Sequence, residues 1–334
     1  MKKGYPLIDK MRIVAAILVV GIHIYPFKNI SPVIDFILTR ILGRLAVPFF
    51  FMVTAYFLFQ DGYPSHEKIK KTLFDLGKWY MISVIIYLPI LIYNGYLTRP
   101  HLFFEILKDI FIDGLFYHLW YFPAVMIGLI IVLYLLKYFK KSQVFYITTG
   151  LYLIGLCGDS YYQLVIHLPI LKNVLSCLFQ LMDYSRNGFF FTPLFIVLGI
   201  FASQEQPISK QKHGLILLLA LFLMTVETTC IHTFQLFKHD SMTFSLPFVS
   251  YYLLTLLVRV KGKRYRRLKD LSLYIYIIHP LMIIIVKEIS QIMKMNWLFS
   301  NNLIQFMIVL LLTLLSFYII QVFLQEVKKH ERIL

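Results

Sequence analysis

The residues of this sequence best suited to chemistry are an arginine and a histidine eleven positions apart in one apolar stretch, Arg12 and His23. Eleven positions of α-helix make three turns plus about 20° and cover about 16 Å, so the two side chains share a helix face at different depths. A neutral imidazole can take a proton from a hydroxyl near pH 7, which makes His23 a candidate general base. Arg12 has Asp9 three residues before it as a local partner. The alternative for His23 is a hydrogen-bonded packing residue that never titrates.

Three further arginines could bind an acidic group. Arg40 and Arg44 are one turn apart and therefore lie on one helix face, and Arg186 opens a later apolar stretch. Guanidinium groups bind carboxylates or phosphates through two parallel hydrogen bonds. We expect these three residues, together with Arg12, to hold a substrate or an acyl donor. The alternative for Arg40 and Arg44 is snorkelling to the outer membrane interface.

Polar side chains also interrupt later apolar stretches, notably Glu227 and His279. A charged side chain in hydrocarbon costs about 2.5–3.5 kcal/mol, so each one needs a partner, a cavity or a function. We predict that Glu227 or His279 orients or charges His23 during catalysis, and that Trp120 and Tyr274 help to bind substrate. The alternative for Trp120 is an interfacial aromatic belt, and for His279 a bond to the backbone at a proline kink.

Long apolar segments must position these residues. The 334-residue chain is 59% hydrophobic and 15% charged, with a mean hydropathy of +0.73, whereas soluble proteins carry about 25% charged residues. A helix needs about 20 apolar residues to cross a bilayer. We therefore expect an all-α integral membrane protein of about ten transmembrane helices, forming one domain over 1–334 without a soluble catalytic domain. The expected spans are 10–27, 36–60, 72–96, 119–136, 143–158, 187–202, 214–232, 244–259, 270–287 and 303–325.

The basic residues gather in alternate loops between these spans, from Lys2 and Lys3 at the start to the run 259–269. The positive-inside rule then places both termini in the cytoplasm. This placement, rather than nucleic-acid binding, accounts for the formal net charge of +16. The run 259–269 is interpreted as a topology determinant that also touches anionic membrane lipid, with contact to the phosphates of a coenzyme donor as the alternative.

In this topology the helices that carry His23, Glu227 and His279 all run outward, so the three side chains come out at similar depths. The arginines of the outer side and Trp120 lie above them. We predict a polar cavity inside the helix bundle at this level. The three cysteines have no metal-ligand spacing, and no metal or bound cofactor is expected.

Four sequence elements resemble the acyltransferase-3 family of membrane proteins, and the resemblance runs over essentially the whole chain. They are the spacing of Arg12 and His23, the stretch 44–57, the segment 118–120 and the stretch 272–279. The resemblance implies cytoplasmic acyl-CoA as donor substrate, a hydroxyl-bearing extracytoplasmic acceptor such as a cell-envelope glycan, and location in the bacterial cytoplasmic membrane. It also implies proton transfer by His23 and a holding role for Arg12 and Arg44.

Within that family the chain looks most like the membrane half of the VanT-type serine racemases of vancomycin resistance, on the stretches 9–27, 44–57 and 186–193. Those proteins carry a pyridoxal-phosphate racemase domain after the membrane part. For this branch the resemblance implies supply or uptake of L-serine rather than acylation. The family usually has Ser-Gly-Tyr where this chain has residues 54–56, Thr-Ala-Tyr, which removes a glycine that permits close backbone approach.

Two main hypotheses follow from the sequence. In an O-acyltransferase, His23 removes the acceptor proton and the cations neutralise donor phosphates. In an amino-acid carrier, Arg44 or Arg186 pairs with the substrate carboxylate and Glu227 with its amine. A weaker third hypothesis is a membrane anchor for a catalytic partner, in which the charged residues serve folding alone.

Overall fold

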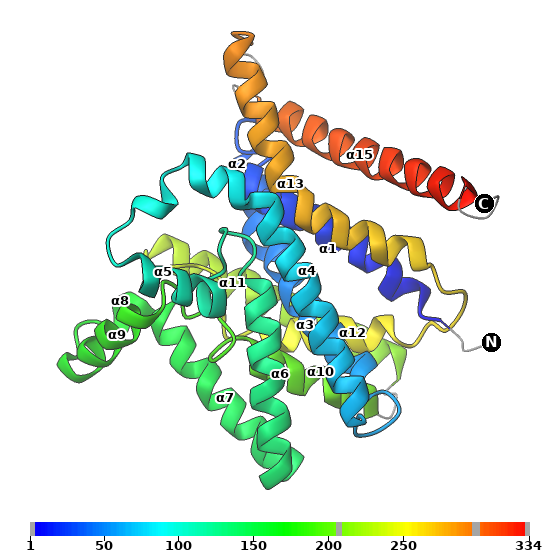
Figure 1. Cartoon of the computed structure of the whole chain (residues 1–334). Coiled ribbons are helices and arrows are strands. Elements are labelled where there is room, and N and C mark those ends of the chain that lie inside the picture. The colour runs from blue at the N-terminus through cyan, green and yellow to red at the C-terminus, as the bar shows by residue number, and fades with distance from the viewer. Residues whose placement is uncertain (1–3, 205–208, 296–300, 331–334) are drawn as a thin grey trace. The chain divides into compact units, whose positions relative to one another are not determined.

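The computed structural model describes residues 4–204, 209–295 and 301–330, and the named elements within these residues are helices joined by turns and loops (Figure 1). The described part contains no β-strand, and its single β-bridge joins Gly4 to Gly262. Lys2 and Lys3, which contribute to the predicted topology, lie outside the described residues. The all-α prediction is therefore confirmed.

Six helical segments of the described chain are long and apolar enough to cross a membrane. Three shorter apolar helices, Pro169–Leu181, Thr192–Gln204 and Leu246–Leu257, fall below that length. The count of ten spans and the cytoplasmic placement of the termini stay predictions. The six segments are Pro32–Phe59, His66–Tyr93, Tyr121–Tyr138, Gln211–Thr233, Arg266–Ile292 and Asn302–Val327.

The chain divides into two compact units, one made of Met1–Ala46 with Val260–Leu334 and the other of Val47–Arg259. The prediction of a single membrane domain is not tested by this division. The first unit contains α1 (Pro6–Ile24), α2 (Pro32–Phe36), the π-helix η1 (Ile37–Leu42), the 3-10 helix η2 (Gly43–Leu45), α13 (Arg266–Ile292) and α15 (Asn302–His330).

Helices α1 and α13 lie side by side and run parallel (Figure 1). Gly4 pairs with Gly262 just before the first turns of the two helices. The ring of His23 on α1 contacts the ring of His279 on α13 further along both helices, so the two run in the same direction. Helix α15 runs antiparallel to α1, since the Asn302 amide donates to the carbonyls of Ile24 and Tyr25 at 3.0 Å each. Apolar side chains of all three helices form the core between them: Ala16, Val20, Ile24, Ile275, Val286 and Val309.

The end of α1 is fixed by an unusual backbone conformation at Tyr25. This residue has a φ of 57° and a ψ of 63°, in the left-handed region that bulky residues rarely adopt. Its N–H donates to the carbonyl of Gly21 at 2.8 Å, and the Asn302 amide covers the last carbonyls. Because the helix end is held from two sides, the position of His23 in the last turn is well defined.

The helix that carries Arg40 and Arg44 is irregular. It begins as α2 with Ser31 as N-cap, whose hydroxyl accepts from the Ile34 N–H, and then passes through η1 and η2 before regular helix resumes. A side-chain Cβ at Gly43 would lie 2.7 Å from Ile22, so only glycine permits this approach to α1. Mid-helix π and 3-10 segments of this kind are frequent at functional sites.

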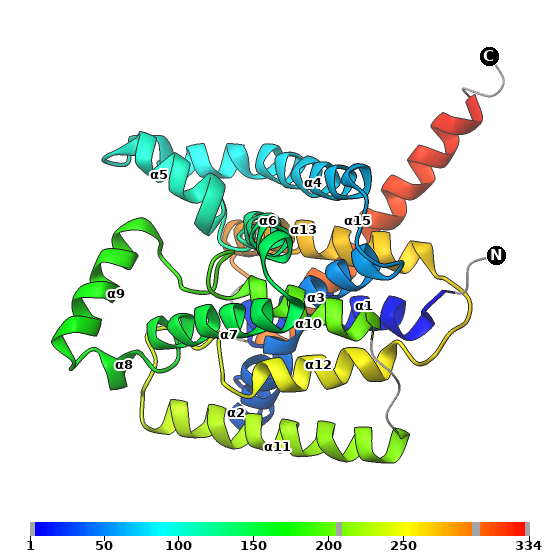
Figure 2. The same ribbon diagram turned by 90° about the horizontal axis from the view of Figure 1, so that it is seen from below.

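The second unit is built around α10 (Thr192–Gln204), which is buried along nearly its whole length and packs on α6, α7 and α12 (Figure 2). A Cβ at Gly199 would lie 2.4 Å from the Met52 carbonyl oxygen, so α10 and α3 approach closely at a glycine. The other elements of this unit are α3 (Ala46–Phe59), α4 (His66–Tyr93), η3 (Tyr96–Thr98), α5 (Leu102–Lys108), η4 (Asp109–Asp113), α6 (Tyr121–Tyr138), α7 (Lys141–Gly158), α8 (Tyr162–Val165), α9 (Pro169–Leu181), α11 (Lys210–Thr233) and α12 (Leu246–Leu257).

Candidate functional site

Two histidines from different helices of the first unit meet face to face. The rings of His23 on α1 and His279 on α13 are 5.3 Å apart between centroids and inclined by 28°. His279 is fully buried, and His23 is partly exposed. The structure thus brings together two of the three residues that we predicted to be catalytic.

The hydrogen bond of His279 sets its tautomer. Its Nδ1 lies 2.9 Å from the Ile275 carbonyl oxygen. A carbonyl oxygen only accepts, so Nδ1 carries the proton and donates. In the neutral ring Nε2 is then a proton acceptor. An imidazole fixed in this way offers a defined surface against which the His23 ring stacks.

Arg12 lies near the other end of α1 and is held by a carboxylate. Its Nη1 donates to Asp9 Oδ1 at 2.9 Å, and the two side chains are 12% and 6% exposed. Asp9 Oδ2 also accepts from the Tyr265 N–H at 2.9 Å. One buried carboxylate therefore orients Arg12 and anchors the start of α13, within the basic run 259–269.

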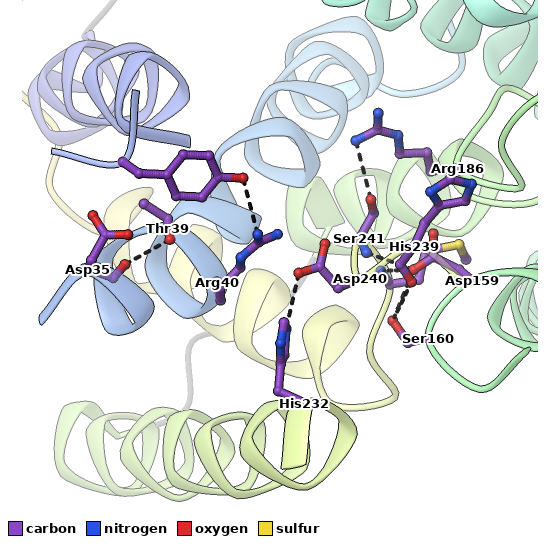
Figure 3. A network of polar contacts seen from close by, with 12 residues as sticks. Asp35, Thr39, Arg40, Asp159, Ser160, Arg186, His232, His239, Asp240 and Ser241 are labelled. Atoms are coloured by element: carbon purple, nitrogen blue, oxygen red, sulfur yellow. Dashed lines mark hydrogen bonds and ion pairs between the residues drawn. The ribbon is translucent and has the colours of Figure 1, made fainter. Parts of the chain in front are cut away.

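Arg40 reaches back to the end of α1. Its Nη2 donates to the Tyr25 hydroxyl at 3.1 Å, and its guanidinium carbon lies 5.2 Å from the centre of that ring. Figure 3 shows Arg40 beside Asp35 and Thr39, whose hydroxyl donates to the Asp35 carbonyl at 2.7 Å. Arg44 follows in η2 and is partly buried. Both arginines thus belong to the irregular part of the second helical segment.

Tyr274, the last predicted binding residue of this unit, lies on α13 one turn before His279. Its hydroxyl donates to the Ser316 hydroxyl of α15 at 3.0 Å, and its ring packs on Phe317 at 5.2 Å. These contacts link α13 to α15. The role of Tyr274 in binding substrate stays a prediction.

In the second unit, Arg186 and Trp120 come together. The guanidinium carbon of Arg186 lies 5.1 Å from the Trp120 ring centre and 4.4 Å from the Tyr184 ring centre. Such contacts stabilise a cation by about 0.5–2 kcal/mol. Arg186 Nη1 also donates to the Ser241 hydroxyl at 3.2 Å. Trp120 itself packs edge-on against Phe51 at 6.2 Å, so its ring is part of an aromatic layer at the start of α6.

A buried aspartate that we did not predict lies beside Arg186. Figure 3 shows Asp159, at the end of α7, with the loop that joins α11 to α12. Its Oδ1 accepts from the backbone N–H groups of Ser241 and Met242 at 2.7 and 2.9 Å and from the Ser160 hydroxyl at 2.9 Å. Burial raises the pKa of Asp159 to about 7, although these hydrogen bonds and the Arg186 charge act in the opposite direction.

His239 of the same loop completes this cluster. Its ring lies 4.4 Å from the Tyr184 ring. Burial, together with the positive charges of Arg186 and Lys238, lowers the pKa of His239 to about 4, so the ring is neutral at pH 7. Hereafter the Asp159 cluster means Asp159, Ser160, Tyr184, Arg186, His239 and Ser241.

Glu227, the third predicted catalytic residue, organises the loop before α12. Its Oε1 accepts from the Tyr161 hydroxyl at 2.6 Å and from the Phe244 N–H. Its Oε2 accepts from the backbone N–H of Ser245 at 2.9 Å and from the Ser245 hydroxyl. Four donors of the chain thus converge on one carboxylate at the N-terminus of α12, which is the arrangement of a helix cap.

Three further carboxylates, of Asp109, Asp113 and Asp183, lie within 4.8 Å of one another. Each already has a donor from the chain: the Tyr96 hydroxyl on Asp109, the Asp183 N–H on Asp113, and the Lys108 ammonium on Asp183. Burial raises the pKa of Asp113 to about 7. Because each carboxylate already accepts a hydrogen bond from the chain, this group gives no reason to assign a metal ion.

The predicted site residues therefore fall into two groups. His23, His279, Arg12, Arg40, Arg44 and Tyr274 belong to the first unit, and Trp120, Arg186 and Glu227 to the second. The shared depth of His23 and Glu227 stays a prediction. Sequence reasoning missed Asp159 and His239, although an aspartate directly after the expected span 143–158 was a usable signal.

A family model described as an acyltransferase domain matches residues 5–322. An amino-acid racemase of Enterococcus faecalis is 39% identical over 332 residues, which is 96% of this chain and 46% of that protein. A serine/alanine racemase of Enterococcus gallinarum is 36% identical over 314 residues, 92% of this chain and 44% of that protein. The chain thus spans less than half the length of these curated relatives. No solved structure matches the chain.

Proposed function

Because the chain belongs to the acyltransferase-3 family, we propose that it is a membrane-embedded O-acyltransferase. It takes an acyl group, with acetyl as the expected one, from cytoplasmic acyl-CoA and transfers it to a hydroxyl of an extracytoplasmic acceptor such as a cell-envelope glycan. The protein acts in the bacterial cytoplasmic membrane and needs no bound cofactor, since the donor is a substrate.

The observation that carries this proposal is the stacked pair of His23 and His279. In the proposed reaction His23 takes the proton of the acceptor hydroxyl, and the hydroxyl oxygen attacks the thioester carbonyl. The carbon–sulfur bond then breaks, the new ester is released, and the coenzyme A thiolate leaves with the proton that His23 returns. His279, whose Nδ1 proton is engaged by Ile275, keeps the His23 ring in place.

Arg12 is assigned to the donor side. It lies eleven residues before His23 on α1, about 16 Å along the helix, and its charge is partly balanced by Asp9. An extended donor whose phosphates lie near Arg12 would bring its thioester towards His23. Arg40 and Arg44 supply further positive charge for donor or acceptor groups.

Transfer of labelled acetyl groups from acetyl-CoA in membranes that contain the protein tests this proposal. His23→Ala is expected to lower the rate by about 100-fold or more, the usual contribution of a general base. His66→Ala, which changes an exposed histidine at the start of α4, is the matched control and should leave the rate unchanged. Equal activity of wild type and His23→Ala would remove His23 from the mechanism.

A second candidate function is binding or uptake of L-serine as the membrane part of a VanT-type racemase system in vancomycin resistance. It is favoured by the names of the relatives, an amino-acid racemase and a serine/alanine racemase. Uptake of labelled L-serine into proteoliposomes without coenzyme A would support this candidate. Acetyl transfer without any serine uptake would support the acyltransferase instead.

A further inference from the structure

Two buried polar atoms of the Asp159 cluster have no hydrogen-bond partner among the described residues: Asp159 Oδ2 and Arg186 Nε. Asp159 is fully buried. A buried polar atom without a partner costs about 1–3 kcal/mol, more when it belongs to a charged group. Such atoms in a native structure call for an explanation, and a ligand that supplies the missing partners is one.

The rest of each side chain is firmly held. The backbone N–H groups of Ser241 and Met242 fix Asp159 Oδ1, so Oδ2 can point in one direction only. The guanidinium of Arg186 lies against the rings of Trp120 and Tyr184, and Nη1 is bound to Ser241. The acceptor and the donor are therefore preorganised, which lowers the entropic cost of binding.

The two charged groups are close but do not contact each other. The positive charge of Arg186 acts on Asp159, yet no ion pair within 4.0 Å joins them among the described residues. Instead Ser241 lies between them, accepting from Arg186 through its hydroxyl and donating to Asp159 through its N–H. Figure 3 shows this relay.

The pair of charges limits the chemistry of the ligand. An isolated anion would meet the Asp159 carboxylate, and an isolated cation would meet the Arg186 guanidinium. A molecule with both charges a few bonds apart satisfies both partners. His239 adds no charge, since it is neutral at pH 7.

We propose that Asp159 and Arg186 form a binding site for a small zwitterion, an α-amino acid, whose ammonium group donates to Asp159 Oδ2 and whose carboxylate accepts from Arg186 Nε. This site differs from the amino-acid site that the sequence suggested, because Glu227 is replaced by Asp159 as the partner of the amine. Glu227 already accepts four hydrogen bonds from the chain. The inference rests on the second candidate function and is independent of acyl transfer.

Equilibrium binding of labelled L-serine to the full chain in nanodiscs tests the site. The measurement is made at pH 8, where Asp159 is ionised. At this pH Asp159→Asn keeps the Oδ1 acceptor and removes the charge, and Arg186→Gln removes the guanidinium. Each should raise the Kd about tenfold or more, because a charged partner is left alone. The control is Asp183→Asn, which removes a carboxylate that is more than half exposed and bound to Lys108, and it should leave the Kd unchanged.

A competition experiment on the wild-type protein tests the same site and does not depend on whether a variant folds. L-Alanine and glycine carry both charges and should displace L-serine, whereas ethanolamine and propionate carry one charge each and should not. Displacement by ethanolamine or propionate as strong as that by L-alanine would overturn the proposal. Absence of L-serine binding to the wild type, or equal binding by Asp159→Asn, would also overturn it.

Binding and uptake measurements together distinguish failure of the Asp159–Arg186 site from failure of the proposed uptake of L-serine. Saturable binding of L-serine that Asp159→Asn weakens, without uptake into proteoliposomes, would support the site and remove the uptake function. Uptake that persists in both Asp159→Asn and Arg186→Gln would support the uptake function and overturn the site.

Discussion

The histidine pair of the first unit and the Asp159 cluster of the second are built on different principles. In the first unit, His23 and His279 lie on long regular helices, and the exactness of their contact comes from helix packing around an apolar core. In the second unit, Asp159 and Arg186 lie at helix ends and in loops, where backbone N–H groups and aromatic rings fix them.

Each way of holding polar side chains suits a different task. Histidines on packed helices are kept at a constant distance, which suits a proton transfer that fails when atoms move by about 1 Å. Helix ends carry backbone N–H and C=O groups that have no partner within the helix. Polar side chains held there by such groups can bind a ligand. The comparison predicts that changes in the first cluster reduce turnover, while changes in the second reduce binding or stability.

After the loss predicted above for His23→Ala, the largest expected effect is on turnover, in His279→Ala. We expect kcat of acyl transfer to fall about 10- to 100-fold, because the His23 ring loses the partner that positions it. His279→Asn is the matched variant, since its amide can still donate to the Ile275 carbonyl but lacks Nε2. A loss of kcat in both variants with unchanged thermal stability of His279→Asn would show that the histidine pair acts on turnover. Normal kcat in both variants would show that it does not.

The next effect is on stability, in Glu227→Ala. The substitution removes the acceptor of four hydrogen bonds at the start of α12, and we expect a loss of about 3 kcal/mol in unfolding free energy. Thermal unfolding in detergent measures it. Glu227→Gln keeps one oxygen acceptor and should lose less. If acyl transfer falls in Glu227→Gln while the melting temperature does not change, Glu227 is catalytic and our structural assignment is wrong.

A pH-dependent effect is expected for Asp159→Asn. The pKa of Asp159 is raised to about 7 in the folded protein, from an ordinary value of 3.8. Between these values the folded state keeps a proton that the unfolded state has lost, so the wild type loses stability as pH rises from about 4 to 7. The variant lacks this loss. Its melting temperature relative to wild type should therefore rise between pH 5 and pH 8, by the equivalent of about 3 kcal/mol in unfolding free energy. A constant difference would mean that Asp159 does not titrate in this range.

The smallest effect is expected for Tyr25→Phe. It removes the hydroxyl that accepts from Arg40 and leaves the ring contact in place. We expect a loss of about 1 kcal/mol in unfolding free energy and little change in kcat. Tyr25→Gly is the companion variant, because it relieves the left-handed backbone at the cost of the ring. A large loss of kcat in Tyr25→Phe would show that the Arg40 contact takes part in the reaction.

The helices were predictable from the sequence, and several details of the site were not. Each expected span coincides with a helix or helical segment, because apolar length is a local property of the chain. The proximity of His23 and His279 agrees with the similar depths that we inferred for them. The left-handed Tyr25 and the π and 3-10 turns around Arg40 had no sequence signal, since they depend on tertiary contacts. Asn302 of α15 donates to the Tyr25 carbonyl, and η1 and η2 pack against α1.

The partners of the carboxylates were hardest to predict. Glu227 looked like an unpaired charge inside a span, but the donors that satisfy it come from a loop that hydropathy does not resolve. Asp159 was not singled out from the sequence, and it is buried because the segment 238–242 folds over it. Hydrogen bonds between distant loops depend on tertiary structure, which periodicity cannot supply.

The pairing of the first helix with α13 also has a consequence for synthesis. The Tyr265 N–H that shares Asp9 with Arg12 follows it by 256 residues, so at about 5–20 residues per second the ribosome needs roughly 13–50 s to supply it. During that interval the ion pair between Asp9 and Arg12 is available within α1 itself. The arginine charge on the first helix is thus balanced by Asp9 before α13 and α15 have been synthesised.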